Sequence, residues 1–173
     1  MSIFKTYWFS YLKYRLTGNM EILISYYRDK GMIIGKNCKI YSGIATPESY
    51  LIEIGDNVTI ATGAKFITHD NSISKVCSEY TDVFGRICIG NNCFIGAYSI
   101  ILPGVSLGNN TIVASGSVVT KSFDGGVIAG VPARIISSIE DYKTKTAPYG
   151  VNVDGLSYDD KKAKVLNSIL IEK

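Results

Sequence analysis

Residues 89–120 read IGNNCF-IGAYSI-ILPGVS-LGNNTI-VASGSV-VT, a stretch that repeats every six residues. The first place of each hexad is aliphatic: Ile89, Ile95, Ile101, Leu107, Val113 and Val119. A helix places apolar residues three and four apart and a simple strand alternates by two, so neither element explains a period of six. Fixed-period repetition indicates a solenoid, in which each hexad forms a short strand and a corner. Because one coil cannot bury its aliphatic side chains alone, the repeat must stack on further coils.

The same repeat extends toward the N-terminus. Further hexads begin at Ile34, Ile40, Ile54, Ile60 and Phe66. Two stretches interrupt it: the frame slips between Ile40 and Ile54, and residues 70–86 form a longer stretch without a period. Long irregular loops inside a compact repeat are more often functional than accidental, and repeat proteins place insertions on one face. We therefore expect loop 70–86 to take part in binding.

The coil sequences identify a family resemblance. The runs IGDNVTIA (54–61), IILPGV (100–105), GSVVTK (116–121) and AGVPAR (129–134) resemble those of the hexapeptide-repeat acyltransferases, most of all the sugar O-acetyltransferases of bacterial surface-polysaccharide biosynthesis. The resemblance implies a mainly β fold, a left-handed parallel β-helix that is triangular in section. It also implies a homotrimer, with acetyl-CoA bound as co-substrate in a groove between neighbouring subunits.

The flanks of the repeat predict helices. We expect an N-terminal helical segment at 1–32, the β-helix acyltransferase domain at 33–136 with its acceptor loop at 70–86, and a C-terminal helical tail at 137–173. Apolar residues from Ile3 to Leu12 recur at helical spacing. Such a stripe packs on the β-helix or on a neighbouring subunit, or it lies on a membrane surface and serves a lipid-linked substrate. The charged tail helices are expected to cap the open end of the solenoid.

Composition excludes several classes of partner. The net charge is only +3 and no run of basic residues stands out, so nucleic acid is not an expected partner. No apolar run reaches the roughly 18 residues of a membrane span and no signal peptide is evident, which predicts a cytoplasmic protein with peripheral membrane contact as an open alternative. The four cysteines have no CxxC spacing, so we expect inert thiols and no metal.

His69, the only histidine, stands where the repeat gives way to loop 70–86. The run FITHD (66–70) resembles the sugar O-acetyltransferase pattern in which the histidine is the general base. A neutral imidazole can take the proton of a sugar hydroxyl as that hydroxyl attacks the thioester of acetyl-CoA. Asp70 is a candidate to orient the imidazole. Adjacent side chains of a strand point to opposite faces, so the alternative role of Asp70 is to cap the loop.

The family resemblance also assigns the binding residues. It places Ala97 and Ser115 at coil corners beside the pantetheine arm of acetyl-CoA. It places Thr120, Lys121 and Arg134 near the adenosine and phosphates, with Pro132 fixing the last turn of backbone. In the galactoside and maltose acetyltransferases an acceptor-binding Asn occupies the position of Tyr41, so the acceptor here is expected to be a different sugar.

Two other functions stay open at this point. An N-acetyltransferase of an amino sugar would use the same fold and base. A structural or binding β-helix without enzymatic activity would have no affinity for CoA. A hexapeptide-repeat carbonic anhydrase is excluded, because its zinc site needs three histidines and the chain has one.

Overall fold

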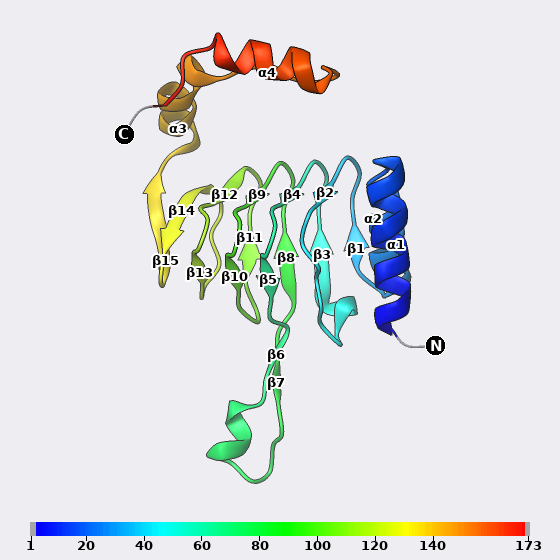
Figure 1. The fold of residues 1–173 in the computed structure, drawn as a ribbon. Coiled ribbons are helices and arrows are strands. Elements are labelled where there is room, and N and C mark those ends of the chain that lie inside the picture. The colour runs from blue at the N-terminus through cyan, green and yellow to red at the C-terminus, as the bar shows by residue number, and fades with distance from the viewer. Residues whose placement is uncertain (1–2, 172–173) are drawn as a thin grey trace.

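The computed structural model describes residues 3–171, and side chains from Tyr7 onward. Short strands stack into a parallel β-helix with three faces (Figure 1). The first face holds β1 (Ile33–Ile34), β3 (Ile52–Ile54), β8 (Ile87–Ile89) and β11 (Ser106–Leu107). The second holds β2 (Lys39–Ile40), β4 (Thr59–Ile60), β9 (Phe94–Ile95), β12 (Thr111–Val113), β14 (Gly126–Gly130) and β15 (Ala133–Ser137). The third holds β5 (Lys65–Phe66), β10 (Ile100–Ile101) and β13 (Val118–Val119).

The hexad residues form the core of the solenoid. Equivalent residues pair directly across coils, as Ile60 with Ile95 and Ile95 with Val113, so their side chains stack inside the triangle. All three are 0% exposed. Burial of one such side chain contributes about 1.5–3 kcal/mol, and the predicted period of six is confirmed as the repeat of the core.

Polar corners join the first face to the second. The backbone N–H of Asp56 donates to Asn91 Oδ1 at 2.7 Å, and the N–H of Asn91 donates to Asn109 Oδ1 at 2.7 Å. The asparagine that follows each of these donors takes a left-handed backbone conformation, with φ of 55° at Asn57 and 57° at Asn92. The Gly-Asp/Asn-Asn pattern of the repeat thus closes the turn and ties each coil to the next.

Gly96 tests how closely the coils pack. A Cβ atom added there would lie 2.5 Å from both Ser115 N and Val113 O, which are backbone atoms of the next coil. We expect Gly96→Ala to lower the free energy of unfolding by about 1–3 kcal/mol, because the coils must move apart. Ser115→Ala, an exposed change at the same corner, should have an effect within about 0.5 kcal/mol. Urea denaturation at one protein concentration measures both, and equal effects would contradict the close approach.

Both interruptions of the repeat lie at one corner, between the third face and the first. The first-coil loop runs through the 3-10 helix η1 (Ser49–Leu51). One coil later, β6 (His69–Asp70), η2 (Ser72–Lys75) and β7 (Val83–Phe84) form an arm that projects from the body (Figure 1). The two loops are stacked, because the Thr46 and Thr68 hydroxyls hydrogen-bond each other.

Two helices precede the first coil, α1 (Ile3–Thr17) and α2 (Glu21–Asp29). The α2 side chains of Leu23, Ile24 and Tyr27 are buried in the core of the solenoid. Tyr7 and Tyr11 of the predicted stripe pack against that core, together with Tyr14. Trp8 and Leu12 of the same stripe are 61% and 57% exposed, so the prediction is confirmed only in part. The side chains of Ile3 and Phe4 lie outside the described residues. Within residues 3–171, no helix is long and apolar enough to cross a membrane.

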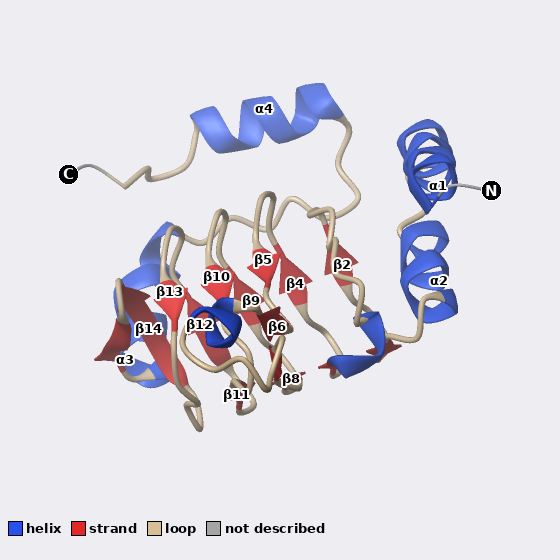
Figure 2. Cartoon of the chain, turned by 90° about the horizontal axis from the view of Figure 1, so that it is seen from below, coloured by secondary structure: helices blue, strands red, loops and turns tan. Residues whose placement is uncertain are grey.

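The C-terminal tail forms the expected helices in an unexpected place. Strand β15 pairs antiparallel with β14 at the last coil. Beyond it lie α3 (Ile139–Thr146), η3 (Ala147–Tyr149) and α4 (Tyr158–Leu166), with the Ser138 hydroxyl accepting the Asp141 N–H at 3.0 Å. Neither α3 nor α4 has a buried residue, and Figure 2 shows α4 apart from the strands. β15 itself therefore occupies the edge of the last coil, and α3 lies next to β14. The expected cap is wrong for α4.

Candidate active site

His69 stands at the base of the projecting arm. It belongs to β6, opposite Phe84 of β7, with 6.0 Å between the centres of the two rings. Gly85 returns the arm to the coil, and a Cβ atom on it would lie 2.2 Å from Gly104 N. Because Gly85 has no side chain, the base of the arm can approach the backbone of the next coil closely. The His69 side chain is 38% exposed, which leaves the ring accessible to a ligand.

Glu48, from the loop one coil earlier, holds the imidazole. Its Oε2 lies 2.8 Å from His69 Nδ1 and accepts the Thr68 hydroxyl at 2.8 Å. The Glu48 side chain is only 14% exposed. Burial raises the pKa of this carboxyl, but the hydrogen bonds from Thr68 and His69 and the charge of the imidazole outweigh it, so the pKa is lowered. An ionised carboxylate at this distance favours the tautomer that carries its proton on Nδ1, which leaves Nε2 with a free lone pair.

Asp70 makes a different contact from the one expected of an orienting residue. Its Oδ1 accepts the Ser72 N–H at 2.8 Å, and this bond, with that from the Ser72 side chain, lowers the pKa of the exposed carboxyl. The contact closes the turn into η2, which is the loop-capping alternative. The Nδ1 contact belongs to Glu48. That residue has no motif of its own; the only signal for it is its place in an interruption one coil before the histidine.

Ala97 and Ser115 meet at one corner of the solenoid. The Ala97 carbonyl accepts the Gly116 N–H at 2.8 Å, so the two corners are stacked. Tyr98 lies beside them with φ of 57°, where the neighbouring coils have Gly63 and Gly116. An aromatic residue in this conformation is strained, and its ring is 70% exposed.

The other predicted cofactor residues lie near the C-terminal end of the solenoid and are all exposed: Thr120, Lys121, Pro132 and Arg134. Lys121 Nζ lies 5.5 Å from the centre of the Phe123 ring. Arg134 of β15 lies opposite Ala129 of β14, and its guanidinium donates to the Ala133 carbonyl at 2.8 Å. Each cation has N–H groups beyond those used in these contacts.

Tyr41 is the predicted acceptor-binding residue. It follows β2 and is 47% exposed. Together with Tyr14, Arg15 and Thr62 it lines a small cavity of about 130 Å³. The corner loop at Glu48, rather than Tyr41, supplies the first coil's contact with His69.

The cysteines and the acidic residues form no metal site in the part of the chain described. Within residues 3–171, no three His, Cys, Asp or Glu side chains are grouped closely enough to hold an ion. Cys38 and Cys93 are buried in the coils, and burial raises the pKa of both thiols. A thiol that stays protonated at neutral pH is a poor nucleophile.

Comparison with known proteins identifies the class. The family model described as bacterial transferase hexapeptide (six repeats) matches residues 89–121. Protein CapG of Staphylococcus aureus is 45% identical over 146 residues, which cover 81% of this chain and 85% of CapG. The chain therefore belongs to the hexapeptide-repeat transferase family. The expected left-handed parallel β-helix and the assignment to the acyltransferases are confirmed.

Two further relatives are acetyltransferases by name. The galactoside O-acetyltransferase of Escherichia coli K12 is 34% identical over 110 residues, 62% of this chain and 54% of that enzyme, so the match spans about half its length. The crystal structure of a maltose O-acetyltransferase from Clostridium difficile 630 superposes with a TM-score of 0.53 at 25% identity. It covers 79% of this chain and 88% of that one.

Proposed function

We propose that this protein transfers the acetyl group of acetyl-CoA to a hydroxyl of a sugar. The observation that carries the proposal is His69 Nδ1 bound at 2.8 Å to the carboxylate of Glu48. This arrangement supplies a proton acceptor of the kind that acyl transfer to a hydroxyl needs. Similarity to the galactoside and maltose O-acetyltransferases supports the reaction type.

In the proposed reaction, His69 Nε2 takes the hydroxyl proton as the sugar oxygen bonds to the thioester carbonyl carbon. A backbone N–H at a coil corner stabilises the oxyanion of the tetrahedral intermediate. When the carbon–sulfur bond breaks, the imidazolium returns its proton to the sulfur of CoA. Glu48 stabilises the imidazolium between these two steps, and the products are the acetyl ester and free CoA.

The proposed CoA groove runs along the solenoid. In this proposal the pantetheine arm of CoA lies at the stacked corners of Ala97 and Ser115. The phosphates of CoA lie at Lys121 and Arg134, beside Thr120 and Pro132. One chain supplies only one wall of such a groove, so we infer that neighbouring subunits of a homotrimer supply the other. The exposed Phe94 and Tyr98, at 42% and 70%, are apolar surface available for that contact.

Removing either cation of the groove tests the phosphate contacts. We expect Lys121→Ala and Arg134→Ala to raise the KM for acetyl-CoA about 5- to 20-fold and to change kcat little, because a phosphate contact is equally strong in ground and transition states. Lys162→Ala, an exposed charge on α4, is the matched control and should leave both constants unchanged. A fall in kcat at constant KM would place these side chains at the reacting atoms instead.

The acceptor is tested by the release of CoA thiol from acetyl-CoA. A sugar that carries only hydroxyls should support turnover, and its amino analogue should not exceed it. The panel should hold free, nucleotide-linked and lipid-linked forms of the sugars of surface polysaccharides, since their biosynthesis is the proposed pathway. Faster turnover of the amino sugar would instead make the protein an N-acetyltransferase. Absence of CoA affinity in a calorimetric titration would favour a structural or binding β-helix without enzymatic activity.

A further inference from the structure

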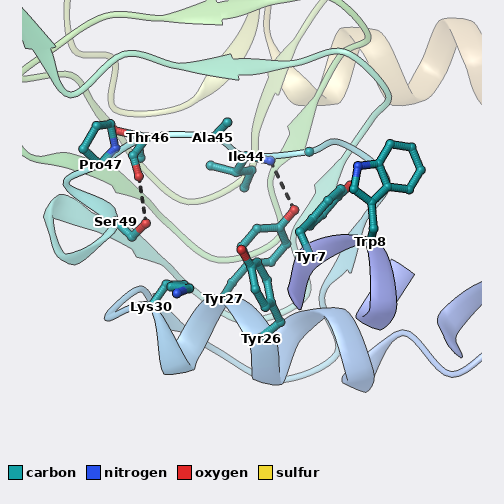
Figure 3. A pocket seen from close by; sticks show the side chains of 11 residues that line it. Tyr7, Trp8, Tyr26, Tyr27, Lys30, Ile44, Ala45, Thr46, Pro47 and Ser49 are labelled. Atoms are coloured by element: carbon teal, nitrogen blue, oxygen red, sulfur yellow. Dashed lines mark hydrogen bonds between the residues drawn. The ribbon is translucent and has the colours of Figure 1, made fainter. Parts of the chain in front are cut away.

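An aromatic cavity of about 530 Å³ lies between the N-terminal helices and the first corner loop (Figure 3). Four rings form the helical side: Tyr7 and Trp8 from α1, and Tyr26 and Tyr27 from α2. Ile44 and Pro47 of the corner loop lie across from them. A mostly apolar cavity of this size is typical of a site for an organic ligand.

The most deeply buried phenol of the cavity wall, that of Tyr27, already has hydrogen-bond partners. The Tyr27 hydroxyl donates to the Ser42 carbonyl at 3.0 Å and accepts the Ile44 N–H at 3.1 Å, so it is already paired. Burial raises the pKa of this phenol, which keeps it uncharged. The charge at the cavity is the ammonium of Lys30, 5.9 Å from the centre of the Tyr26 ring. Among the described residues that line the cavity, Lys30 is the only charged one.

The cavity and the candidate base share one loop. Thr46, Pro47 and Ser49 line the cavity, while Glu48 between them binds His69. The Thr46 hydroxyl bonds that of Thr68, which in turn donates to Glu48. A ligand seated in the cavity therefore lies against the loop that positions the imidazole.

An apolar stripe continues from the cavity along α1. Trp8 lines the cavity and is also 61% exposed, and Leu12 and Leu16 follow at four-residue steps with 57% and 78% exposure. Lys13 and Arg15 lie on the same stretch of helix. A hydrocarbon chain longer than the cavity thus has apolar surface to follow outward, flanked by cations that suit a phospholipid headgroup region.

We infer that this cavity binds the hydrocarbon chain of a lipid-linked sugar phosphate, with the phosphate at Lys30 and the sugar directed to His69. The inference rests on the proposed function, because it names the class of acceptor for that reaction. Aromatic and aliphatic walls with one unopposed cation fit an apolar chain that ends in a phosphate better than they fit a free, uncharged sugar. The proposal also accounts for the exposed face of α1.

Trp8 is the only tryptophan, so its fluorescence reports on the cavity directly. Titration of the full chain with farnesyl phosphate, below its micelle concentration and without acetyl-CoA, should give a saturable shift of emission to shorter wavelength as the ring loses water. Farnesol should bind about tenfold more weakly, the size of one charge-assisted contact. Lys30→Gln should remove this difference, and uridine monophosphate should not compete.

Filling the cavity provides the second arm of the test. Ala45 is exposed and lines the cavity, so Ala45→Phe should abolish the emission shift, while Ala163→Phe on α4 should retain it. Melting temperature checks the folding of both variants, and Lys30→Gln decides the question if Ala45→Phe does not fold. Absence of a shift in the wild type, or competition by uridine monophosphate, would overturn the inference. Because no acetyl-CoA is present, neither result depends on whether acetyl transfer occurs.

Discussion

His69→Ala is expected to reduce turnover by about 10²- to 10⁴-fold, the usual contribution of a positioned general base. The fold should persist, because His69 lies at the base of the arm and outside the aliphatic core. CoA affinity should also persist, because the proposed groove lies at the coil corners. Stopped assays of thiol release measure the turnover, calorimetry measures CoA binding, and circular dichroism measures the fold.

The pH profile gives an independent check on this expectation. Wild-type kcat/KM should rise with pH across the range in which histidines lose their proton, between about pH 5 and 8. The kcat/KM of the alanine variant should not show this rise with pH. A folded variant that binds CoA and acetylates at nearly the wild-type rate would remove His69 from the mechanism and leave it a structural residue.

Glu48→Gln is expected to reduce kcat by about 10²-fold, since the amide keeps the size of the side chain but no longer fixes the proton on Nδ1. The KM for acetyl-CoA should stay constant, which a general loss of structure would not produce. Asp70→Asn, at the residue next to the histidine, is the matched control, and it should stay within about twofold of wild type because Asp70 bonds Ser72. Equal losses in the two variants would restore Asp70 as an orienting residue.

The stability of Glu48→Gln should depend on pH in a direction set by the lowered pKa of Glu48. A carboxyl whose pKa is lower in the folded protein stabilises it above the ordinary glutamate value of about 4.3, and that stabilisation is lost as pH falls through the folded value. Wild type should therefore be more stable than the variant near neutral pH. The difference should shrink once the pH falls below the ordinary glutamate value and vanish below the lowered value of the folded protein, which urea denaturation at several pH values measures.

The six-residue period was sufficient to predict the solenoid. Each hexad pairs one inward aliphatic with one polar corner, and this local pattern repeats without reference to distant residues, so Ile60, Ile95 and Val113 are identified as core from their spacing alone. The stacking of Ala97 on Ser115 follows for the same reason, because the two lie one complete coil apart.

Other features depend on insertions, whose length has no period. Glu48 meets His69 across 21 positions only because both interruptions occupy the same corner in successive coils. The aromatic cavity likewise needs two helices that fold back over the first coil. An apolar stripe predicts that a helix packs on another part of the protein, but it does not identify that part. The tail helices show the same limit, since their charged sequence predicts helices and caps but not their distance from the solenoid.

The sequence by itself thus determined the coil, its core, its polar corners and a lone histidine at the entry to an irregular loop, because these depend on local spacing and on residue type. Only the tertiary structure decided which carboxylate orients that histidine and which rings enclose the neighbouring cavity. The physical reason is that coil stacking brings together side chains from loops of unequal length, and hydrogen-bond geometry then selects Glu48 over the adjacent Asp70.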